Sequence, residues 1–294
     1  MFIALALLSS LSWAGPNALY GEDNRHEVFA ETNGVIKTAA LSTAALVSED
    51  KMQEIPGGFR LAGRTLGNLY QMCSTERFRN QPVVATCSGT LVAPDIIMTA
   101  GHCYDRETDV CKNNKWIFDY RVSKDNQVEV IVPSSSVYNC LEVLHMENNM
   151  ETGSDYALIR LDRGVHDRYP VSLQKKPSKL NDDLVLIGHP SGLPTKIADK
   201  GNVQKIFENH FISNLDAFTI NSGSGVFNPK TGEAVGILAS GRIDYESKTG
   251  CTKPIVYNID EGNEAVFKIG KIIELLKKET RAQRSKDRSS RLRP

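Results

Sequence analysis

Short apolar runs separated by turn residues fill the middle of the chain, from about residue 60 to residue 260. Turn sequences such as Pro-Asp, Lys-Asp-Asn and Pro-Ser-Gly lie between them. The clearest runs are PVVATCSGTLVA (82–93), IIMTA (96–100), QVEVIVP (127–133), YALIRLD (156–162), LVLIG (184–188) and EAVGILAS (233–240). Many short strands with frequent turns and hardly any helical periodicity predict an all-β barrel or sandwich.

The C-terminal part of the chain has a different pattern. Apolar residues follow a spacing of three and four at Val266, Ile269, Ile272, Ile273 and Leu276. This spacing predicts one amphipathic α-helix over residues 263–280. The following sequence RAQRSKDRSSRLRP has no apolar face, so we expect a disordered basic tail over residues 281–294.

The N-terminal fourteen residues, MFIALALLSSLSWA, are nearly all apolar or small. They are too few to span a bilayer and end in the small residues Ser12 and Ala14, so they predict a signal peptide over residues 1–14. The usual Lys or Arg at its start is missing, and the alternative is a buried or interfacial segment. Residues 15–60 have a mixed composition and are expected to form an N-terminal arm or a removable pro-segment.

The composition fits an ordinary soluble globular protein, with 40% hydrophobic and 24% charged residues in a chain of 294. The formal net charge is zero, so no global field favours nucleic acid or an anionic membrane. No stretch after the first fourteen residues is long and apolar enough for a membrane anchor. These properties exclude no enzyme class, but they favour neither nucleic-acid binding nor membrane insertion.

The chain has six cysteines, an even number that suggests disulfides in an exported protein and allows fifteen pairings. A metal site is the competing use. However, no C-x-x-C pair occurs, and the spacings match no zinc module, so we expect no metal. One pairing to consider joins Cys111 to Cys140 and Cys73 to Cys251.

The first segment with candidate chemistry is CSGTLVAPDIIMTAGHC, residues 87–103. Two strand-like runs flank a Pro-Asp turn, and His102 follows the second run. A general base must be held rigidly, with one ring nitrogen free near the nucleophile. A disulfide between Cys87 and Cys103 would lock the strand end that carries His102. Taken alone, a Gly-His-Cys tripeptide is more often structural.

The second segment is GSDYALIRLD, residues 153–162, in which Asp155 comes directly before an apolar strand. A buried carboxylate there could accept the second N–H of a catalytic histidine, fix its tautomer and stabilise the imidazolium. Taken alone, such an aspartate more often caps a strand or forms a turn.

The third segment is NSGSGVFNPKTGEAVGIL, residues 221–238, where small residues surround Ser222 just before a strand. Serine is a weak nucleophile unless a base takes its proton and N–H groups stabilise the developing oxyanion. A glycine-rich bend allows backbone N–H groups to point at one spot. Taken alone, Ser-Gly-Ser-Gly is usually a flexible loop.

The three segments come in the order His, Asp, Ser. This is the order in chymotrypsin-like enzymes, and it differs from the order in subtilisin-like enzymes and α/β-hydrolases. We therefore predict a catalytic triad of His102, Asp155 and Ser222.

These segments resemble those of trypsin-like serine proteases. TAGHC with the upstream CSGT is similar to their His segment, and SDYALIRL to their Asp segment. NSGS followed by VF resembles the Ser segment of bacterial glutamyl endopeptidases, and GEDNRHEV, IGHPSGLPTKIADKGNV and DAFTINSGS extend that likeness. The resemblance covers roughly residues 83–280. It implies a disulfide between Cys87 and Cys103.

The resemblance also implies a fold. Proteases of this type have two six-stranded antiparallel β-barrels, the chymotrypsin-like fold, with the active site in the cleft between them. We place the first barrel at residues 61–165, the second at residues 166–262, and the C-terminal α-helix after them.

One residue departs from the family pattern near the nucleophile. Ile220 stands where the family has a glycine whose N–H forms half of the oxyanion hole, and Ser222 would supply the other N–H. A β-branched residue is costly if this backbone needs an unusual conformation. An oxyanion donor is worth about 10²–10³ in rate, so a catalytically impaired, protease-like binding protein is the alternative function.

The residues that would select a substrate are less clearly indicated. Asp216 lies six residues before Ser222, where trypsin carries its selector for basic side chains, and a carboxylate there would favour Arg or Lys. Similar glutamyl endopeptidases also have an aspartate there, so it could equally be structural. Ser240 and Gly241 are expected to form a pocket wall and an edge that pairs with the substrate backbone.

The sequence thus predicts a secreted serine endopeptidase that hydrolyses peptide bonds through an acyl-enzyme. Its partners would be protein or peptide substrates, with no nucleic acid and no membrane anchor, and we expect a monomer. No metal or organic cofactor is expected. The remaining histidines are expected to have surface or structural roles: His26, His145, His166, His189 and His210.

Overall fold

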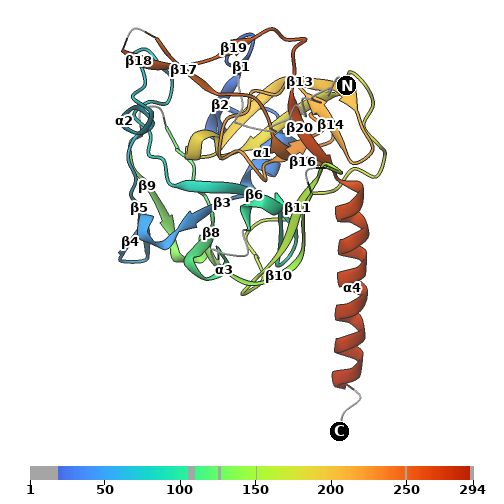
Figure 1. Cartoon of the computed structure of the whole chain (residues 1–294). Helices are drawn as coiled ribbons and strands as arrows, with labels where there is room; N and C mark the ends of the chain where they lie inside the picture. Colours follow the sequence, from blue (N-terminus) through green and yellow to red (C-terminus); the bar gives the residue numbers. More distant parts are fainter. Residues whose placement is uncertain (1–18, 105–109, 125–126, 150, 249, 292–294) are drawn as a thin grey trace, which may run out of the picture.

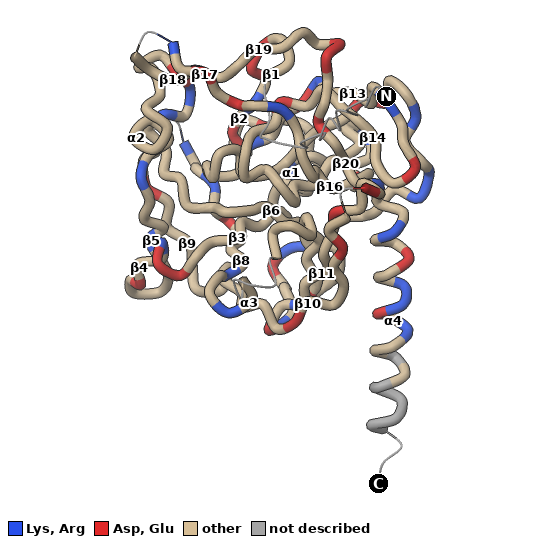
Figure 2. Tube along the Cα trace, viewed as in Figure 1, with Lys and Arg blue, Asp and Glu red and all other residues tan. Residues whose placement is uncertain are grey.

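The computed structural model describes residues 19–104, 110–124, 127–149, 151–248 and 250–291. Two β-barrels pack against each other, and a long C-terminal helix extends away from them (Figure 1). Acidic and basic residues alternate along the backbone of both barrels (Figure 2), in keeping with a formal net charge of zero. The expected signal peptide, residues 1–14, lies outside the described residues.

The first barrel is a closed ring of six antiparallel strands. In ring order they are β10 (Val137–Asn149), β11 (Ser154–Leu161), β7 (Ile96–Thr99), β6 (Ala85–Ala93), β3 (Thr43–Ser48) and β8 (Asn114–Phe118). Inward-facing apolar residues fill the ring, among them Trp116, Leu91 and Ile159, which are fully buried. Gly89 lies against this core because a Cβ there would meet the Trp116 ring at 2.7 Å.

The second barrel also closes through six antiparallel strands, because β12 pairs with both β15 and β13. In ring order they are β12 (Asp183–Gly188), β15 (Gly225–Phe227), β16 (Ala234–Ser240), β20 (Glu264–Lys268), β14 (His210–Ser213) and β13 (Lys196–Ile206). Its interior holds Phe211, Val203 and Leu238, all fully buried. The expected all-β fold of two six-stranded barrels is therefore confirmed.

An apolar layer joins the two barrels. Ile96 and Leu158 of the first barrel share one buried cluster with Ile187 and Phe227 of the second. Because the layer removes these side chains from water, it favours one fixed arrangement of the barrels. The predicted runs at 82–93, 96–100, 127–133, 156–162, 184–188 and 233–240 each overlap one of the observed strands.

Smaller elements surround the barrels. The three-stranded sheet consists of β4 (Met52–Ile55), β5 (Gly58–Leu61) and β9 (Val130–Pro133), and β17 (Tyr245–Lys248) forms a hairpin with β18 (Cys251–Pro254). β1 (Leu19–Tyr20) pairs in parallel with β19 (Val256–Tyr257), and β2 (Arg25–Glu27) joins β13. The short helices and 3₁₀ turns are α1 (Gly34–Leu41), α2 (Leu66–Tyr70), α3 (Val110–Asn113), η1 (Val28–Ala30), η2 (Glu49–Lys51), η3 (Gly101–Cys103), η4 (Ser134–Ser136) and η5 (Pro190–Gly192).

Of the segment expected to be an N-terminal arm, residues 15–60, the described residues 19–60 are instead part of the folded body. Its strand β3 lies between β6 and β8 in the first barrel, with Ala44, Ala45 and Val47 fully buried. Its strand β2 is paired with β13 of the second barrel. The boundary expected at residue 60 is therefore wrong, because removing residues 15–60 would open the first barrel.

The C-terminal helix α4 (Gly270–Arg291) begins later and ends later than expected. Residues 264–268 belong to strand β20, so Val266 faces a barrel core rather than a helix face. Beyond residue 280 the helix continues to Arg291, where the sequence predicted a disordered tail. Arg, Gln, Lys and Ala lose little on entering a helix, and this accounts for the extension.

Three disulfides link all six cysteines: Cys87 to Cys103, Cys111 to Cys140, and Cys73 to Cys251. The first confirms the pairing that the resemblance implies, and the other two confirm the pairing considered from the sequence. Disulfides of this number fit an oxidising, extracellular environment. Among the described residues, no helix is both long and apolar enough to cross a bilayer.

Candidate active site

His102 lies in the turn η3, directly after strand β7. The turn is tightly packed, because a Cβ on the preceding Gly101 would lie 2.0 Å from the Glu147 carbonyl oxygen. The following Cys103 is tied to Cys87 on β6. Strand pairing, close packing and a covalent bond thus hold the backbone of His102 from both sides, as a general base requires.

Asp155 accepts two hydrogen bonds from His102. The His102 ring nitrogen Nδ1 lies 2.6 Å from Asp155 Oδ2, and the His102 backbone N–H donates to Asp155 Oδ1 at 2.9 Å. The pairing of β11 with β7 produces this contact, because it sets Ala157 opposite Thr99 and so brings Asp155 beside the residues after β7. With Nδ1–H donated to the carboxylate, ring nitrogen Nε2 is the one left to act as a base.

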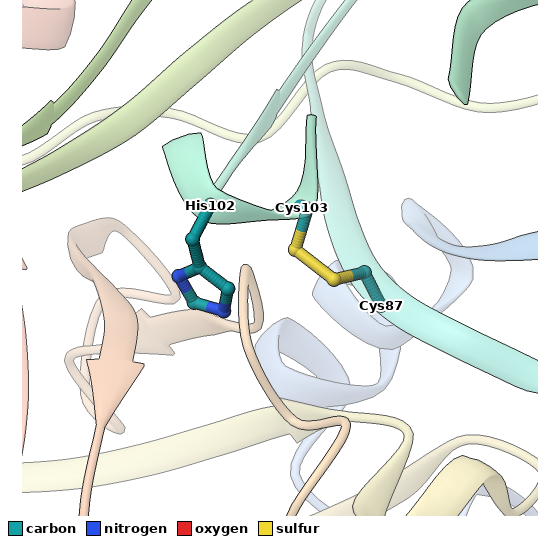
Figure 3. A group of neighbouring side chains, drawn as sticks. All are labelled: Cys87, His102 and Cys103. Carbon is teal, nitrogen blue, oxygen red and sulfur yellow. A yellow bond between two sulfur atoms is a disulfide. The ribbon is translucent and has the colours of Figure 1, made fainter. Parts of the chain in front are cut away.

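The His102 ring also lies next to the Cys87–Cys103 disulfide (Figure 3). A ring nitrogen of His102 and the two sulfur atoms lie within 4.8 Å of one another, a spacing that would suit metal ligands. The two sulfurs are bonded to each other, however, and a thiolate is the form of cysteine that binds metals. In this cluster the disulfide supports the position of His102, and it offers no thiolate ligand for a metal.

The backbone of Ser222 is held against the segment that carries His102. The Ser88 N–H on β6 donates to the Ser222 carbonyl at 2.8 Å, and the Cys103 sulfur lies 3.8 Å from the same oxygen. Gly223 has φ of +85°, and a Cβ there would lie 2.1 Å from the Ser88 carbonyl oxygen, so only glycine fits. Strand β6 thereby joins the serine loop to the turn of the histidine.

The Ser222 side chain is half-buried, and the His102 side chain is 37% exposed. Within the described residues, no hydrogen bond joins the Ser222 hydroxyl to the His102 ring. Hydrogen bonds of this kind are often long without a substrate and tighten when one binds. The structure thus brings His102 and Asp155 into direct contact and holds the Ser222 backbone against Ser88 and Cys103, the residue that follows His102.

The loop of residues 219–224 leaves two backbone N–H groups available. In the described part of the chain, the N–H groups of Ile220 and Ser222 have no acceptor. The other four donate as follows: Thr219 to Asp244 Oδ2 at 2.8 Å, Asn221 to Phe218 O at 2.9 Å, Gly223 to Leu238 O at 2.8 Å and Ser224 to Asn221 O at 2.9 Å. The available donors belong to the two residues predicted for the oxyanion hole.

Ile220 adopts a backbone conformation that suits glycine. Its φ is +72°, in the left-handed region where a β-branched residue is a genuine outlier. Its side chain packs partly buried against the core that contains Val84 and Tyr120. The backbone at Ile220 thus adopts the left-handed conformation of a glycine turn, and this conformation is strained for isoleucine.

Asp216 does not face an open pocket. It is fully buried, its Oδ1 accepts the N–H of Tyr20 at 2.7 Å and its Oδ2 accepts the N–H of Asn24 at 3.1 Å. Burial raises the pKa of Asp216 to about 6, although the two N–H donors oppose this shift. These contacts with the N-terminal segment favour the structural alternative over a role in selecting basic substrates.

Ser240 and Gly241 lie where strand β16 ends, and both are half-buried. Ser240 is set opposite Ala265 of β20, so this end of the strand remains within the second barrel. Among the described residues, no hydrogen bond uses their backbone outside the sheet. They are therefore placed where an added strand could pair.

Several residues of the site gave no signal in the sequence. Asp244 binds the loop of Ser222 through Thr219, although it is 25 residues away along the chain. Ser88 holds the same loop, and its side chain accepts the N–H of His189 at 3.0 Å. Only the tertiary structure shows these contacts, because a single Ser or Asp in the sequence carries no pattern that identifies its distant partner.

Three of the other histidines have structural partners that involve hydrogen bonds or ion pairs. His189 is fully buried, stacks on Tyr120 at 5.6 Å and contacts the Leu193 carbonyl at 3.1 Å. Burial lowers the pKa of His189 to about 3, so it is uncharged at neutral pH. His26 pairs with Glu31 and His145 with Glu279.

Two comparisons with known proteins bear on identity. The chymotrypsin-like elastase family member 3A of Homo sapiens is 30% identical over 92 residues, which is 31% of this chain and 33% of the elastase. The match therefore spans about a third of that relative. A solved glutamyl endopeptidase in complex with MPD is similar over 89% of this chain and 98% of its own, with 16% identity and a TM-score of 0.52.

A further solved structure is the Rv3671c protease of M. tuberculosis in an inactive form. It shares 13% identity over 84% of this chain and 93% of its own, with a TM-score of 0.49. At these identities, the glutamyl endopeptidase supports the fold and nothing finer.

The family is shown by a sequence model. The model of the trypsin-like peptidase domain matches residues 87–237, which is more than half of the chain. The matched range includes His102, Asp155 and Ser222. Together with the two six-stranded barrels, this match shows that the chain belongs to the trypsin-like peptidase family.

Proposed function

We propose that the protein is a secreted serine endopeptidase that cleaves peptide bonds through an acyl-enzyme on Ser222. In this mechanism His102 is the general base, Asp155 orients it, and the N–H groups of Ile220 and Ser222 form the oxyanion hole. The observation that carries the proposal is the pair of unpartnered N–H groups beside the nucleophile, together with the His102–Asp155 hydrogen bond on the adjoining barrel.

The proton transfers follow from the contact between His102 and Asp155. The carboxylate holds Nδ1–H, so Nε2 accepts the Ser222 proton as Oγ attacks the substrate carbonyl carbon. His102 then gives that proton to the leaving amine, and the acyl-enzyme forms. A water molecule, deprotonated by His102, releases the acyl group and restores the serine.

The negative charge that develops on the substrate carbonyl oxygen needs donors that have no other partner. The Ile220 and Ser222 N–H groups meet this requirement, whereas their neighbours in residues 219–224 are committed to internal acceptors. Each such donor contributes a factor of about 10²–10³ in rate. Ser240 and Gly241 would supply the strand edge that aligns the substrate backbone.

Secretion is the second part of the proposal. Three disulfides persist best outside the cytosol, and the sequence predicts a signal peptide over residues 1–14. We expect the mature protein to be a monomer that acts on protein or peptide substrates. Asp216 contributes no charge selection in this proposal, since both of its oxygens bind the N-terminal segment.

A binding protein without turnover is the alternative. Two observations favour it: the strained φ of Ile220, and the lack of a hydrogen bond between the Ser222 hydroxyl and the His102 ring in the described structure. Such a protein would keep the barrels and bind a peptide, but it would not form an acyl-enzyme.

One experiment separates the two functions. The secreted wild-type protein should react with a fluorophosphonate probe at Ser222 and digest casein. Ser222→Ala should abolish both reactions with an unchanged circular dichroism spectrum. The matched control is Ser224→Ala, which removes the second serine of the same Ser-Gly-Ser-Gly sequence and should retain labelling. A folded wild type that neither labels nor digests would exclude the peptidase and favour the binding protein.

A further inference from the structure

The peptide group between Thr219 and Ile220 carries one of the two proposed oxyanion donors. Its carbonyl oxygen, on Thr219, accepts the N–H of Ser191 at 2.6 Å. Carbonyl and N–H point in opposite directions in a trans peptide. The Ser191 contact therefore turns the Ile220 N–H away from η5, and a flipped peptide would set two N–H donors against each other.

The preceding peptide group is held as well. The Thr219 N–H donates to Asp244 Oδ2 at 2.8 Å, and the Phe218 carbonyl accepts the N–H of Asn221 at 2.9 Å. In the two peptide groups on either side of Thr219, the carbonyls and the Thr219 N–H thus have fixed partners, and the Ile220 N–H has none among the described residues. Residues in strained conformations persist only where their surroundings over-determine them, and these contacts do so for Ile220.

Asp244 is itself firmly placed. It is 1% exposed, and its own carbonyl accepts the N–H of Ile255 at 2.7 Å. The next residue, Tyr245, shares a 2.5 Å hydrogen bond with the Ser191 side chain and packs on the Phe218 ring at 5.4 Å. The start of the β17–β18 hairpin therefore contacts the Thr219 peptides from two sides.

We propose that Asp244 is a positioning residue for the oxyanion hole, which holds the Thr219 N–H so that the next peptide presents the Ile220 N–H to the substrate. This inference rests on the proposed peptidase function. Tyr245 supports the same arrangement through Ser191, and neither side chain contacts the substrate. The hairpin β17–β18 is thus a structural part of the catalytic loop, although it lies after it in sequence.

The test compares two substitutions at one position. Asp244→Ala removes the acceptor of the Thr219 N–H, and Asp244→Asn keeps an amide oxygen there. We expect Asp244→Ala to lower kcat about tenfold or more, with KM within about twofold, because a misplaced oxyanion donor loses part of the 10²–10³ that it supplies. Asp244→Asn should stay within about threefold of the wild type. A kcat for Asp244→Ala equal to the wild-type value would overturn the proposal.

A second measurement does not depend on activity. Crystal structures of the two variants should show the Thr219–Ile220 peptide rotated in Asp244→Ala and unchanged in Asp244→Asn. An unchanged peptide in Asp244→Ala, or a rotated one in both variants, contradicts the positioning role even if the wild type proves inactive. Thermal unfolding of each variant checks that lost activity does not reflect lost folding, and Tyr245→Phe should reproduce a smaller decrease in kcat.

Discussion

The strained backbone at Ile220 leads to a prediction with a definite sign. At an ordinary φ, glycine in place of alanine lowers stability by about 0.5–1 kcal/mol, because glycine loses more conformational freedom on folding. At a positive φ the order reverses, since alanine is then incompatible with the native backbone. Ile220 has φ of +72°, so Ile220→Gly should be more stable than Ile220→Ala.

The magnitude follows from what the two variants share. Both lose the same partly buried isoleucine side chain beyond Cβ, which packs near Gly192 and the core of Val84. The burial term therefore nearly cancels between them. The left-handed conformation costs an L-residue about 1–2 kcal/mol, and the extra freedom of glycine in the unfolded chain offsets part of this. The net difference should be about 1 kcal/mol in favour of glycine.

Equilibrium unfolding in urea measures this difference directly. The two free energies of unfolding should differ by about 1 kcal/mol at equal m-values. If Ile220→Ala is as stable as Ile220→Gly, or more stable, the backbone at this position is not left-handed and the argument about strain fails. In the proposed peptidase, Ile220→Gly should keep kcat/KM within about threefold, because the N–H already has the orientation that glycine allows.

Two further predictions concern stability. Replacing Cys73 and Cys251 with serine removes a disulfide between residues 178 positions apart and should lower the free energy of unfolding by about 2–4 kcal/mol. Chemical denaturation measures this loss, and an unchanged denaturation midpoint would contradict the prediction. Burial raises the pKa of Asp244 to about 8 and that of Asp216 to about 6, so the folded state retains protons that the unfolded chain loses near pH 4. The contribution of Asp216 to stability should therefore fall as the pH rises from about 4 to 6, and that of Asp244 from about 4 to 8, by at most about 1.4 kcal/mol per pH unit for each group. The buried His189, with its pKa lowered to about 3, acts in the opposite direction below about pH 6.5, so the slope above that pH reports on Asp244 more directly. Asp244→Asn should flatten the dependence of the unfolding free energy on pH between about pH 6 and 8. An equal pH dependence in wild type and variant would refute this. The charged and titratable groups that interact with Asp244 are Arg25, Glu264, Tyr70 and Tyr245.

Local patterns were sufficient for much of the fold. Each apolar, β-branched run lies on a strand, five of them in the two barrels and the run at 127–133 in the three-stranded sheet. Such short apolar runs between turn residues can be recognised from the local sequence alone. Strand β13 is indicated by the family resemblance of IGHPSGLPTKIADKGNV and not by periodicity, since KIADKGNVQKI is largely polar. Strand β3 gives no such signal, since TAALVS is rich in alanine. The helix boundary at Gly270 was missed because Val266 fits both a strand and a helical spacing.

The chemistry of His102, Asp155 and Ser222 could be inferred from the sequence because each side chain lies in a short segment with a recognisable pattern. The tertiary structure alone decided which groups meet. Pairing of β11 with β7 brings Asp155 to His102, folding of the N-terminal segment buries Asp216, and the β17–β18 hairpin brings Asp244 to Thr219. These contacts join residues 25 to 196 positions apart, and a local pattern carries no information about which distant partner a polar group will find.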